Sequence, residues 1–338
     1  MTARTVGIAG VLAASVSVAA QPSAPAQAPS RSGQPSTPVQ APSRSGEGEV
    51  RVTKVRSNIY MLTGAGSNIT VMPFEQGAVV VDTGTAAMAD KVLATIGQLS
   101  SKPIADIINT SATTDHVGGN EKLHNAGRRI PFEIVTGEGP MVIAHENVMS
   151  RMSAPTGKQA TAPEKAWPNE TYHVDYKKLA AHYRGGEQIE LMHMPAAHSD
   201  GDSIVWFRHA DVIATGDVFM ENTYPIIEVA NGGTINGTID ALNKILDIAF
   251  ADFRSEGGTM IIPGHGRLCD MSDVGYYRDM LTIILYRVQD MVKRGMTFEQ
   301  VKAAKPTRDY DPRYGATSGA LTTDMFLEAV YKTVGSKK

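Results

Sequence analysis

Short apolar runs, broken by glycine and then alternating with helical patterns, constrain the fold of this chain most strongly. Four closely spaced runs predict a meander of strands at residues 50–55, 59–63, 69–73 and 78–81. A helical pattern at about residues 86–99 then leads into another apolar run at 104–110, and a further helix is expected to open near Gly118. The chain therefore changes from a meander to an alternation of strands and helices.

The second half of the chain shows the same mixture of strands and helices. Strands are predicted at residues 171–176, 188–194, 203–207, 212–215 and 259–262. Helices are predicted at about residues 239–253, 273–294, 297–305 and 322–334, and a long surface loop at 152–170. Two sheets that carry helices on their outer faces, an αββα sandwich of the α+β class, account for this order. We expect this domain to cover residues 49–270, with residues 271–338 as a helical extension packed on it.

The first twenty residues have the pattern of a secretory signal peptide. Arg4 precedes an apolar run of fifteen residues from Val6 to Ala20, which ends in small residues before Gln21. A bilayer-spanning helix needs about 20 residues, so this run is short for a membrane anchor. We predict that residues 1–20 are cleaved and that the protein is periplasmic or secreted, without stable membrane insertion. An uncleaved anchor and a disordered Ala-rich start are the alternatives.

Residues 21–48 are dominated by Pro, Ser, Gln and Ala. The heptapeptide that begins at Gln27 recurs at Gln40. Such a segment cannot bury enough apolar surface to offset the chain entropy lost on folding, so we predict a disordered linker.

The balance of charge favours a small-molecule substrate. The chain has 32 basic and 35 acidic residues among 338 and a formal net charge of −3, with no basic stripe that would attract nucleic acid. Its only cysteine, Cys269, cannot form an internal disulfide. The oligomeric state cannot be inferred.

Metal-ligating residue types follow several predicted strands. The run at 104–110 leads to Asp115 and His116, the run at 212–215 to Asp217, and the run at 259–262 to His265, while His198 precedes the strand at 203–207. Loops at strand ends let a rigid sheet direct side chains toward one point. Because zinc accepts both carboxylate and imidazole ligands, the pattern indicates a zinc-type site.

These segments together resemble the metallo-β-lactamase superfamily, and the resemblance extends from about Val50 to Gly266. The matching segments are Gly66-Ser67-Asn68-Ile69, Val80-Val81-Asp82-Thr83-Gly84, Asn109-Thr110, Asp115-His116-Val117-Gly118-Gly119-Asn120, residues 198–207, Thr215-Gly216-Asp217-Val218-Phe219 and Ile262-Pro263-Gly264-His265-Gly266. The resemblance implies a sandwich with two metals, ordinarily zinc, in a cleft at one edge of the sheets. It also implies that a metal-bound hydroxide attacks an ester, thioester, amide, lactone or lactam carbonyl. The family uses one fold for many substrates, so the particular substrate stays open.

The sequence departs from the family at its signature H-x-H-x-D-H. Ser111 and Thr113 stand where the family has its first two histidines. Neutral hydroxyls are poor zinc ligands, so the family's first metal position retains only His198 and a bridging Asp217. The second position keeps every ligand type of the family, namely Asp115, His116, His265 and the bridging Asp217. We therefore predict one zinc at the second position and leave a second zinc open.

The resemblance also suggests a role for each candidate residue. Asp115 and His116 anchor the metal, His265 completes the ligand set, Asp217 bridges to the reacting water, and His198 orients that water or acts as general base. Asp82, after a buried strand, is expected to support a ligand or fix a turn.

Less specific interpretations and a second class of function remain. An Asp-His pair before a glycine-rich helix is often a turn and a helix cap, and His265 has the alternative of an ordinary loop residue. Loss of two histidines leaves open a catalytically silent protein that binds a ligand in the same cleft. The retained donors in separate loops favour the metal-dependent hydrolase.

Overall fold

The computed structural model describes residues 48–130, 138–154, 160–251 and 257–335. The predicted signal peptide at 1–20 lies outside these residues, as does the predicted linker at 21–48 apart from Gly48. The described residues all belong to the unit Arg44–Lys338.

The first sheet has seven strands that follow one another in chain order. They are β1 (Arg51–Arg56), β2 (Ile59–Ala65), β3 (Ser67–Pro73), β4 (Ala78–Val81), β5 (Ile104–Ile108), β6 (Met141–His145) and β7 (Glu170–Tyr172). Strands β1 to β4 form the predicted antiparallel meander. From β4 to β7 the pairing is parallel, because helices make the connections.

The second sheet has five strands in the order β12-β11-β10-β9-β8. They are β8 (Tyr176–Leu179), β9 (Ile189–His193), β10 (Ser203–Phe207), β11 (Val212–Ala214) and β12 (Met260–Ile262). Only β11 and β12 pair in parallel. Because successive side chains of a strand point to opposite faces, Val79 and Val81 of β4 meet Val205 and Phe207 of β10 in one core between the sheets.

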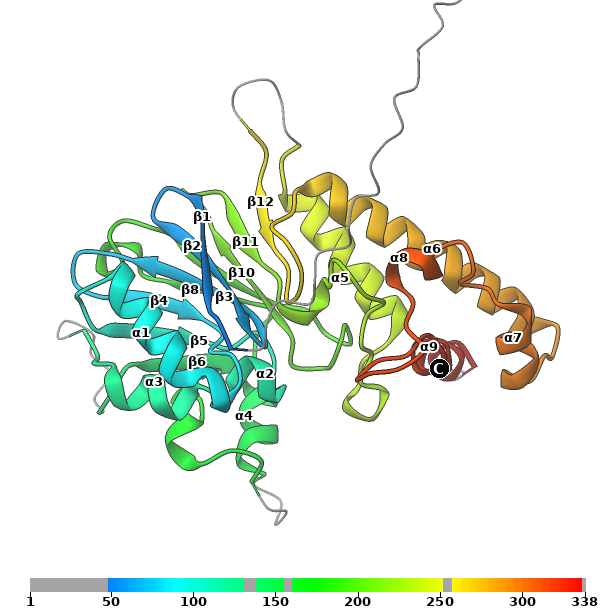
Figure 1. The fold of residues 1–338 in the computed structure, drawn as a ribbon, viewed down its shortest axis with the longest axis horizontal. Helices are drawn as coiled ribbons and strands as arrows, with labels where there is room; N and C mark the ends of the chain where they lie inside the picture. Colours follow the sequence, from blue (N-terminus) through cyan, green and yellow to red (C-terminus); the bar gives the residue numbers. More distant parts are fainter. Residues whose placement is uncertain (1–47, 131–137, 155–159, 252–256, 336–338) are drawn as a thin grey trace, which may run out of the picture. The chain divides into compact units, whose positions relative to one another are not determined.

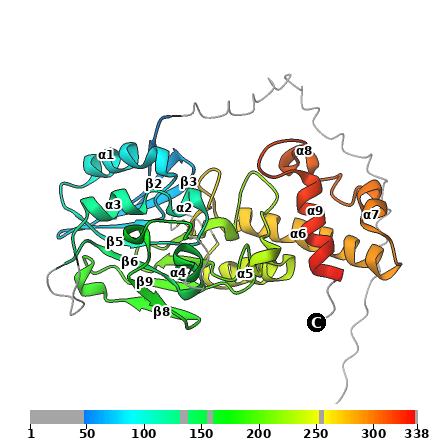
Figure 2. The same ribbon diagram turned by 90° about the horizontal axis from the view of Figure 1, so that it is seen from below.

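Helices cover the outer faces of both sheets, which confirms the predicted αββα sandwich. Helices α1 (Ala89–Leu99) and α3 (Asn120–Ala126) lie on the first sheet, where Val92 and Leu123 pack against Val80 (Figures 1 and 2). On the second sheet, Ile213 packs with α5 (Ile235–Ile248) and α6 (Met271–Lys293).

The C-terminal helices continue the core on the second sheet. They are α6, α7 (Phe298–Ala304), α8 (Asp311–Tyr314) and α9 (Thr323–Gly335). Val330 of α9 and Val301 of α7 belong to the same buried cluster as Ile284 of α6. Asp270 and Thr297 form capping boxes at the starts of α6 and α7.

The sequence prediction is wrong around residues 141–179. The predicted strand at 171–176 is two strands in different sheets, β7 and β8, joined by the exposed residues 173–175. Strand β6 and helix α4 (Glu146–Ser153) were not predicted. Strand β6 is buried along its whole length, so it has no polar alternation to reveal it. Helix α5 also begins and ends earlier than the predicted 239–253.

No helix in the described part of the chain combines the length and apolar character needed to cross a membrane.

A buried histidine marks the junction of β6 and α4. His145 is 3% exposed, and its Nδ1 accepts the backbone N–H of Asn147 at 3.3 Å as the cap of α4. Its ring stacks on His193 with 3.7 Å between the ring centroids. Burial and the charge of His193 lower the pKa of His145 to about 4, while Glu146 and Asp200 oppose the shift. The ring is therefore neutral in the folded protein at neutral pH.

This pKa predicts a pH dependence of stability. In the unfolded chain His145 takes up a proton near its ordinary pKa of 6.5, whereas the folded protein resists protonation down to about pH 4. Stability from the neutral ring is present above pH 6.5 and is lost as the pH falls through this window. We expect His145→Asn, which keeps a capping acceptor, to reduce by about 1–2 kcal/mol the loss of unfolding free energy between pH 7.5 and pH 5. Urea unfolding at both pH values measures this difference.

Substitution of the exposed His209 by Asn serves as the matched control and should leave the pH dependence as in the unaltered protein. The prediction would be contradicted if the unfolding free energy fell by the same amount between pH 7.5 and pH 5 in the His145→Asn variant and in the unaltered protein.

Candidate metal centre

Residues separated by up to 150 positions meet at one edge of the sandwich. Asp115 and His116 lie in α2 (Thr114–Val117), the short helix after β5, and Asp217 lies in the turn η4 (Gly216–Val218) after β11. His265 follows β12, and His198 lies in the loop between β9 and β10. Each residue thus follows the carboxyl end of a strand, so the sheets bring the four loops together.

Three of these residues form a group suited to a metal ion. One ligand atom each from Asp115, His116 and His265 lies within 4.8 Å of the other two. His265 Nε2 lies 3.2 Å from Asp115 Oδ2. Asp217 Oδ1 lies 3.1 Å from His116 Nε2 and 3.4 Å from His265 Nε2, and therefore faces both imidazoles.

Asp82 fixes the orientation of His116 from the opposite side. Its Oδ2 lies 2.7 Å from His116 Nδ1, and it also accepts the hydroxyl of Thr110 at 2.6 Å. The backbone N–H of Thr110 donates to Asp82 Oδ1 at 2.9 Å. This arrangement matches the expected supporting role of Asp82, because a carboxylate at Nδ1 leaves the lone pair of Nε2 toward Asp217.

The contact between His116 and Asp217 shows which charge this part of the site favours. His116 Nδ1 faces Asp82, and His116 Nε2 lies 3.1 Å from Asp217 Oδ1 on the opposite side of the ring. Burial by itself would lower the pKa of His116, yet Asp217 and Asp82 raise it well above its ordinary value. The same imidazole, with its partners, lowers the pKa of the buried Asp217 well below its usual range. The site therefore favours positive charge at this point, which either a proton on His116 or a divalent cation supplies.

The loop that carries His265 is held close to Asp217. The side-chain amide of Asn68 donates to the carbonyls of Pro263 and Gly266. A Cβ on Gly264 would lie 2.7 Å from Asp217 Oδ1, so only glycine permits this approach. Although burial opposes it, hydrogen bonds to Asp115 and Asp217 raise the pKa of His265 to about 9. His265 and Asp115 are the partly exposed members of the group, with side chains 25% and 31% exposed.

His198 lies beside this group but outside it. Its ring is fully buried, and Nδ1 contacts Asp202 Oδ1 at 3.1 Å. Its Nε2 has no hydrogen-bond partner among the described residues and lies 4.0 Å from Asp217 Oδ2. Burial opposes protonation, but Asp202, Asp217 and Glu228 raise the pKa of His198 to about 9. The structure thus brings all five predicted residues together, with His198 on the far side of Asp217 from the other ligands.

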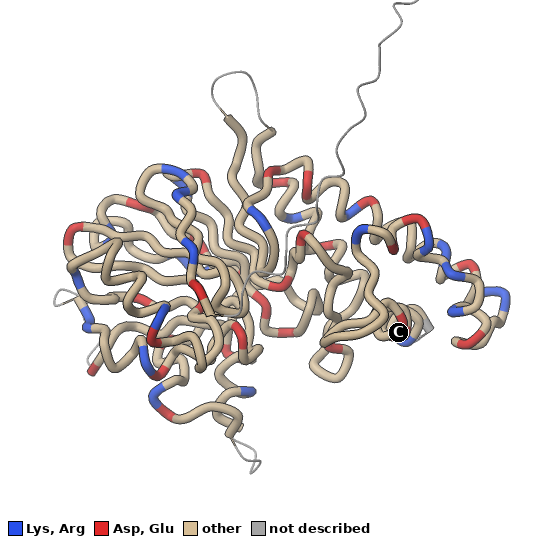
Figure 3. The backbone as a smooth tube through the Cα atoms, viewed as in Figure 1, with Lys and Arg blue, Asp and Glu red and all other residues tan. Residues whose placement is uncertain are grey.

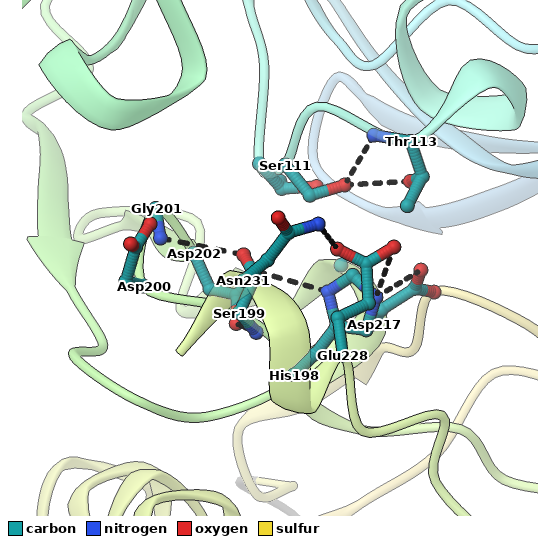
Figure 4. A network of polar contacts seen from close by, with 12 residues as sticks. Ser111, Thr113, His198, Ser199, Asp200, Gly201, Asp202, Asp217, Glu228 and Asn231 are labelled. Atoms are coloured by element: carbon teal, nitrogen blue, oxygen red, sulfur yellow. Dashed lines mark hydrogen bonds and ion pairs between the residues drawn. The ribbon is translucent and has the colours of Figure 1, made fainter. Parts of the chain in front are cut away.

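Ser111 and Thr113, which replace the family's first two histidines, bond to each other. Their hydroxyls are 2.7 Å apart, and the N–H of Thr113 also faces Ser111 Oγ (Figure 4). Two hydroxyls held in this way offer no imidazole nitrogen to a metal.

One carboxylate near His198 was missed in the sequence. Glu228 Oε1 lies 3.8 Å from His198 Nε2, and Figure 4 shows the Glu228 carboxylate beside Asp217. Glu228 immediately precedes the short turn η5 (Val229–Asn231) and follows no predicted strand. No periodic or family motif marks it, so only the folded chain reveals its position.

The αββα sandwich groups carboxylates and imidazoles at the ends of its strands. This is the architecture of proteins that hold a metal at one edge of their sheets. The chain belongs to the metallo-beta-lactamase superfamily, because the model of that family matches residues 62–265. This match agrees with the predicted resemblance, and members of the family are typically hydrolytic metalloenzymes. A comparison with curated protein sequences gives no match.

Solved structures with the same fold include lactamases and a sulfatase. A metallo-beta-lactamase from Pontibacter korlensis gives a TM-score of 0.53 at 18% identity, over 69% of this chain and 99% of that chain. The stereoselective inverting sec-alkylsulfatase Pisa1 from Pseudomonas sp. gives 0.59 at 17% identity, over 84% of this chain and 50% of that chain. The DIM-1 metallo-beta-lactamase gives 0.51 at 16% identity, over 69% and 97%. At these identities the likeness concerns the fold.

Asp82 is expected to influence metal binding through His116, although Asp82 is not itself a ligand. Asp82→Asn keeps the size of the side chain but removes the charge that orients His116. Such changes behind a ligand typically weaken metal affinity by about 10–100-fold, and we expect a loss in this range for zinc. Competition with a chromophoric chelator measures it. An affinity equal to that of the unaltered protein would show that Asp82 has no influence on His116 as a ligand.

Proposed function

We propose that the protein is a metal-dependent hydrolase, exported to the periplasm or outside the cell, which attacks an ester, thioester, lactone or lactam carbonyl. The observation that carries this proposal is the convergence of Asp115, His116 and His265 on one point with Asp217 beside them. The export rests on the signal pattern of residues 1–20. The mixed distribution of acidic and basic residues along the chain (Figure 3) supports a small-molecule substrate.

The donor set suits zinc. Asp115, His116 and His265 would hold it, with Asp217 Oδ1 as the fourth ligand or bridge. Zinc in such a site lowers the pKa of a bound water to near neutrality and polarises a carbonyl oxygen. The partial exposure of Asp115 and His265 leaves one side of the group accessible to a substrate.

The remaining groups position and deprotonate the attacking water. Asp202 at Nδ1 fixes the orientation of the His198 ring, so that Nε2 faces Asp217. A cation held at Asp217 would compensate one of the carboxylates that raise the pKa of His198. His198 would then be placed to accept a proton from water, and Asp217 to orient that water.

A catalytically silent binding protein is the second candidate. The observation that favours it is the pair Ser111 and Thr113, whose hydroxyls bond to each other where the family has two ligands. The retention of every second-position ligand, together with the supporting Asp82, favours the hydrolase.

Replacement of His265 tests the metal site. His265→Ala removes one of three ligands that meet within 4.8 Å, so we expect zinc content in purified protein to fall from about one equivalent to below about 0.2, with loss of turnover. Elemental analysis after dialysis measures the content. His209→Ala, at an exposed position away from these loops, is the matched control and should keep its zinc. Unchanged zinc in the His265→Ala protein would refute the assignment.

Metal removal separates the two candidate functions. The panel contains β-lactams, lactones and thioesters, and also secondary alkyl sulfates because one structural neighbour is named for them. We expect turnover of at least one compound to disappear after chelation and return with zinc. Binding of metal without turnover of any panel member would leave the silent candidate.

A further inference from the structure

A groove, here called the outer groove, lies between helix α5 and the outer face of strands β8, β9 and β10. Its volume is about 690 Å³, and small-molecule sites have volumes of roughly 300–1,000 Å³. None of its lining residues belongs to the candidate metal centre. The strands line it with Tyr176, Met192 and Trp206, and the helix lines it with Gly237, Ala241 and Ile248.

The wall that the second sheet contributes to the outer groove is largely apolar. Met192 of β9, Met194 directly after β9 and Trp206 of β10 all line it. These side chains belong to the buried cluster under α5, whereas Leu191 and Val205, their neighbours along the strands, pack between the two sheets. Because methionine side chains adapt their shape to a contact, this wall suits an apolar ligand body.

Trp206 also brings a hydrogen-bond donor to the outer groove. Its side chain is 9% exposed, and its buried Nε1 has no hydrogen-bond partner among the described residues. The Arg208 guanidinium lies 4.1 Å from the centroid of the ring and donates to Glu190 at 3.0 Å, which holds the indole in place. Since buried N–H groups are nearly always paired, a ligand that carries an acceptor such as a carbonyl oxygen would satisfy this one.

The charged residues at the rim of the outer groove favour a cationic group. Asp175, Asp240 and Lys244 line the groove with exposed side chains, and none of them forms an ion pair with another described residue. Glu190 also lines the groove but is already paired with two basic side chains. Two carboxylates therefore face one ammonium group, and this excess of negative charge attracts a cation.

Contacts on both sides fix the width of the outer groove. On the helix side, a Cβ at Gly237 would lie 1.8 Å from the carbonyl oxygen of Ala196, so only glycine lets α5 approach this loop. On the sheet side, the His193 ring stacks on His145 at 3.7 Å, and its Nε2 lies 2.8 Å from the carbonyl oxygen of Asp200. A site whose walls are fixed in advance loses little conformational freedom when a ligand binds.

We propose that the outer groove is a second binding site, apart from the metal centre, for a small organic ammonium ion whose apolar body carries a carbonyl acceptor. The rim carboxylates of Asp175 and Asp240 attract the ammonium group. The apolar body covers Met192 and Met194, and the carbonyl accepts the indole N–H of Trp206. The proposal is independent of the proposed function, because no residue of this groove is a candidate metal ligand.

The experiment uses the full chain with Trp167→Phe, which leaves Trp206 as the only tryptophan. The probe is the mono-benzamide of ethylenediamine, which combines a phenyl ring, a carbonyl and an ammonium group. Saturation-transfer NMR reports binding of the probe, and Trp206 fluorescence reports where it binds. We expect a saturable change in Trp206 emission with a dissociation constant on the order of 1 mM or below. The benzamide of ethanolamine, which lacks the charge, should bind at least about threefold more weakly.

Replacement of the rim carboxylates tests the charge. Asp175→Asn combined with Asp240→Asn should weaken binding of the ammonium probe at least about threefold and leave binding of the alcohol probe unchanged. Both side chains are exposed, so the fold should persist, and circular dichroism checks this. Asp247→Asn is the matched control, because Asp247 is an exposed carboxylate of α5 that does not line the outer groove. This control should bind both probes as the unaltered protein does.

Three results would overturn the proposal. The first is the absence of saturable binding, or binding that leaves Trp206 emission unchanged. The second is equal affinity for the ammonium and alcohol probes. The third is an equal effect of the double variant and of Asp247→Asn on the affinity for the ammonium probe. None of these results bears on the proposed hydrolase, whose test is the zinc content of the His265→Ala protein.

Discussion

A buried carboxylate shared among three imidazoles is the constraint on which the rest of this site depends. Asp217 is 3% exposed and lies within 3.1–4.0 Å of His116, His265 and His198. Such a group is tolerated only where positive charge compensates it. The glycines around it permit the close packing, since Gly216 has a φ of +53° and Gly264 leaves no room for a Cβ. The backbone of these loops is thus adapted to one side chain.

The sandwich explains how this arrangement is held rigid. Parallel pairing of β4 with β5, and of β11 with β12, sets the loops that carry Asp82, His116, Asp217 and His265 at the same edge. Residues that pack between the sheets, such as Val81 and Ile262, anchor the strands directly before these loops. Loss of packing at the strand ends would therefore move ligands from both sheets, because each sheet supplies part of the set.

The sequence predicted the parts of the fold and site that repeat a pattern. Strands β1 to β4 alternate or are bounded by glycine, and Asp115, His116, Asp217 and His265 each follow an apolar run, so both were recognisable. The missed elements lack such a pattern. Strand β6 is buried along its whole length, and the segment that contains β7 and β8 keeps a strand composition while it changes sheets. Glu228 could not be predicted, because hydrogen bonds within the folded chain determine its position. One of its partners, His198, is distant in sequence, and the other, Asn231, belongs to no motif.

The replacement of two histidines changes the charge of the site as well as its ligand number. Imidazoles are neutral ligands, whereas Glu228 and Asp217 each bring a negative charge to the side that faces His198. This negative charge in a largely buried setting repels an anionic group more strongly than a site of neutral imidazoles would. Two neutral imidazoles are thus absent from a side of the site where two carboxylates remain.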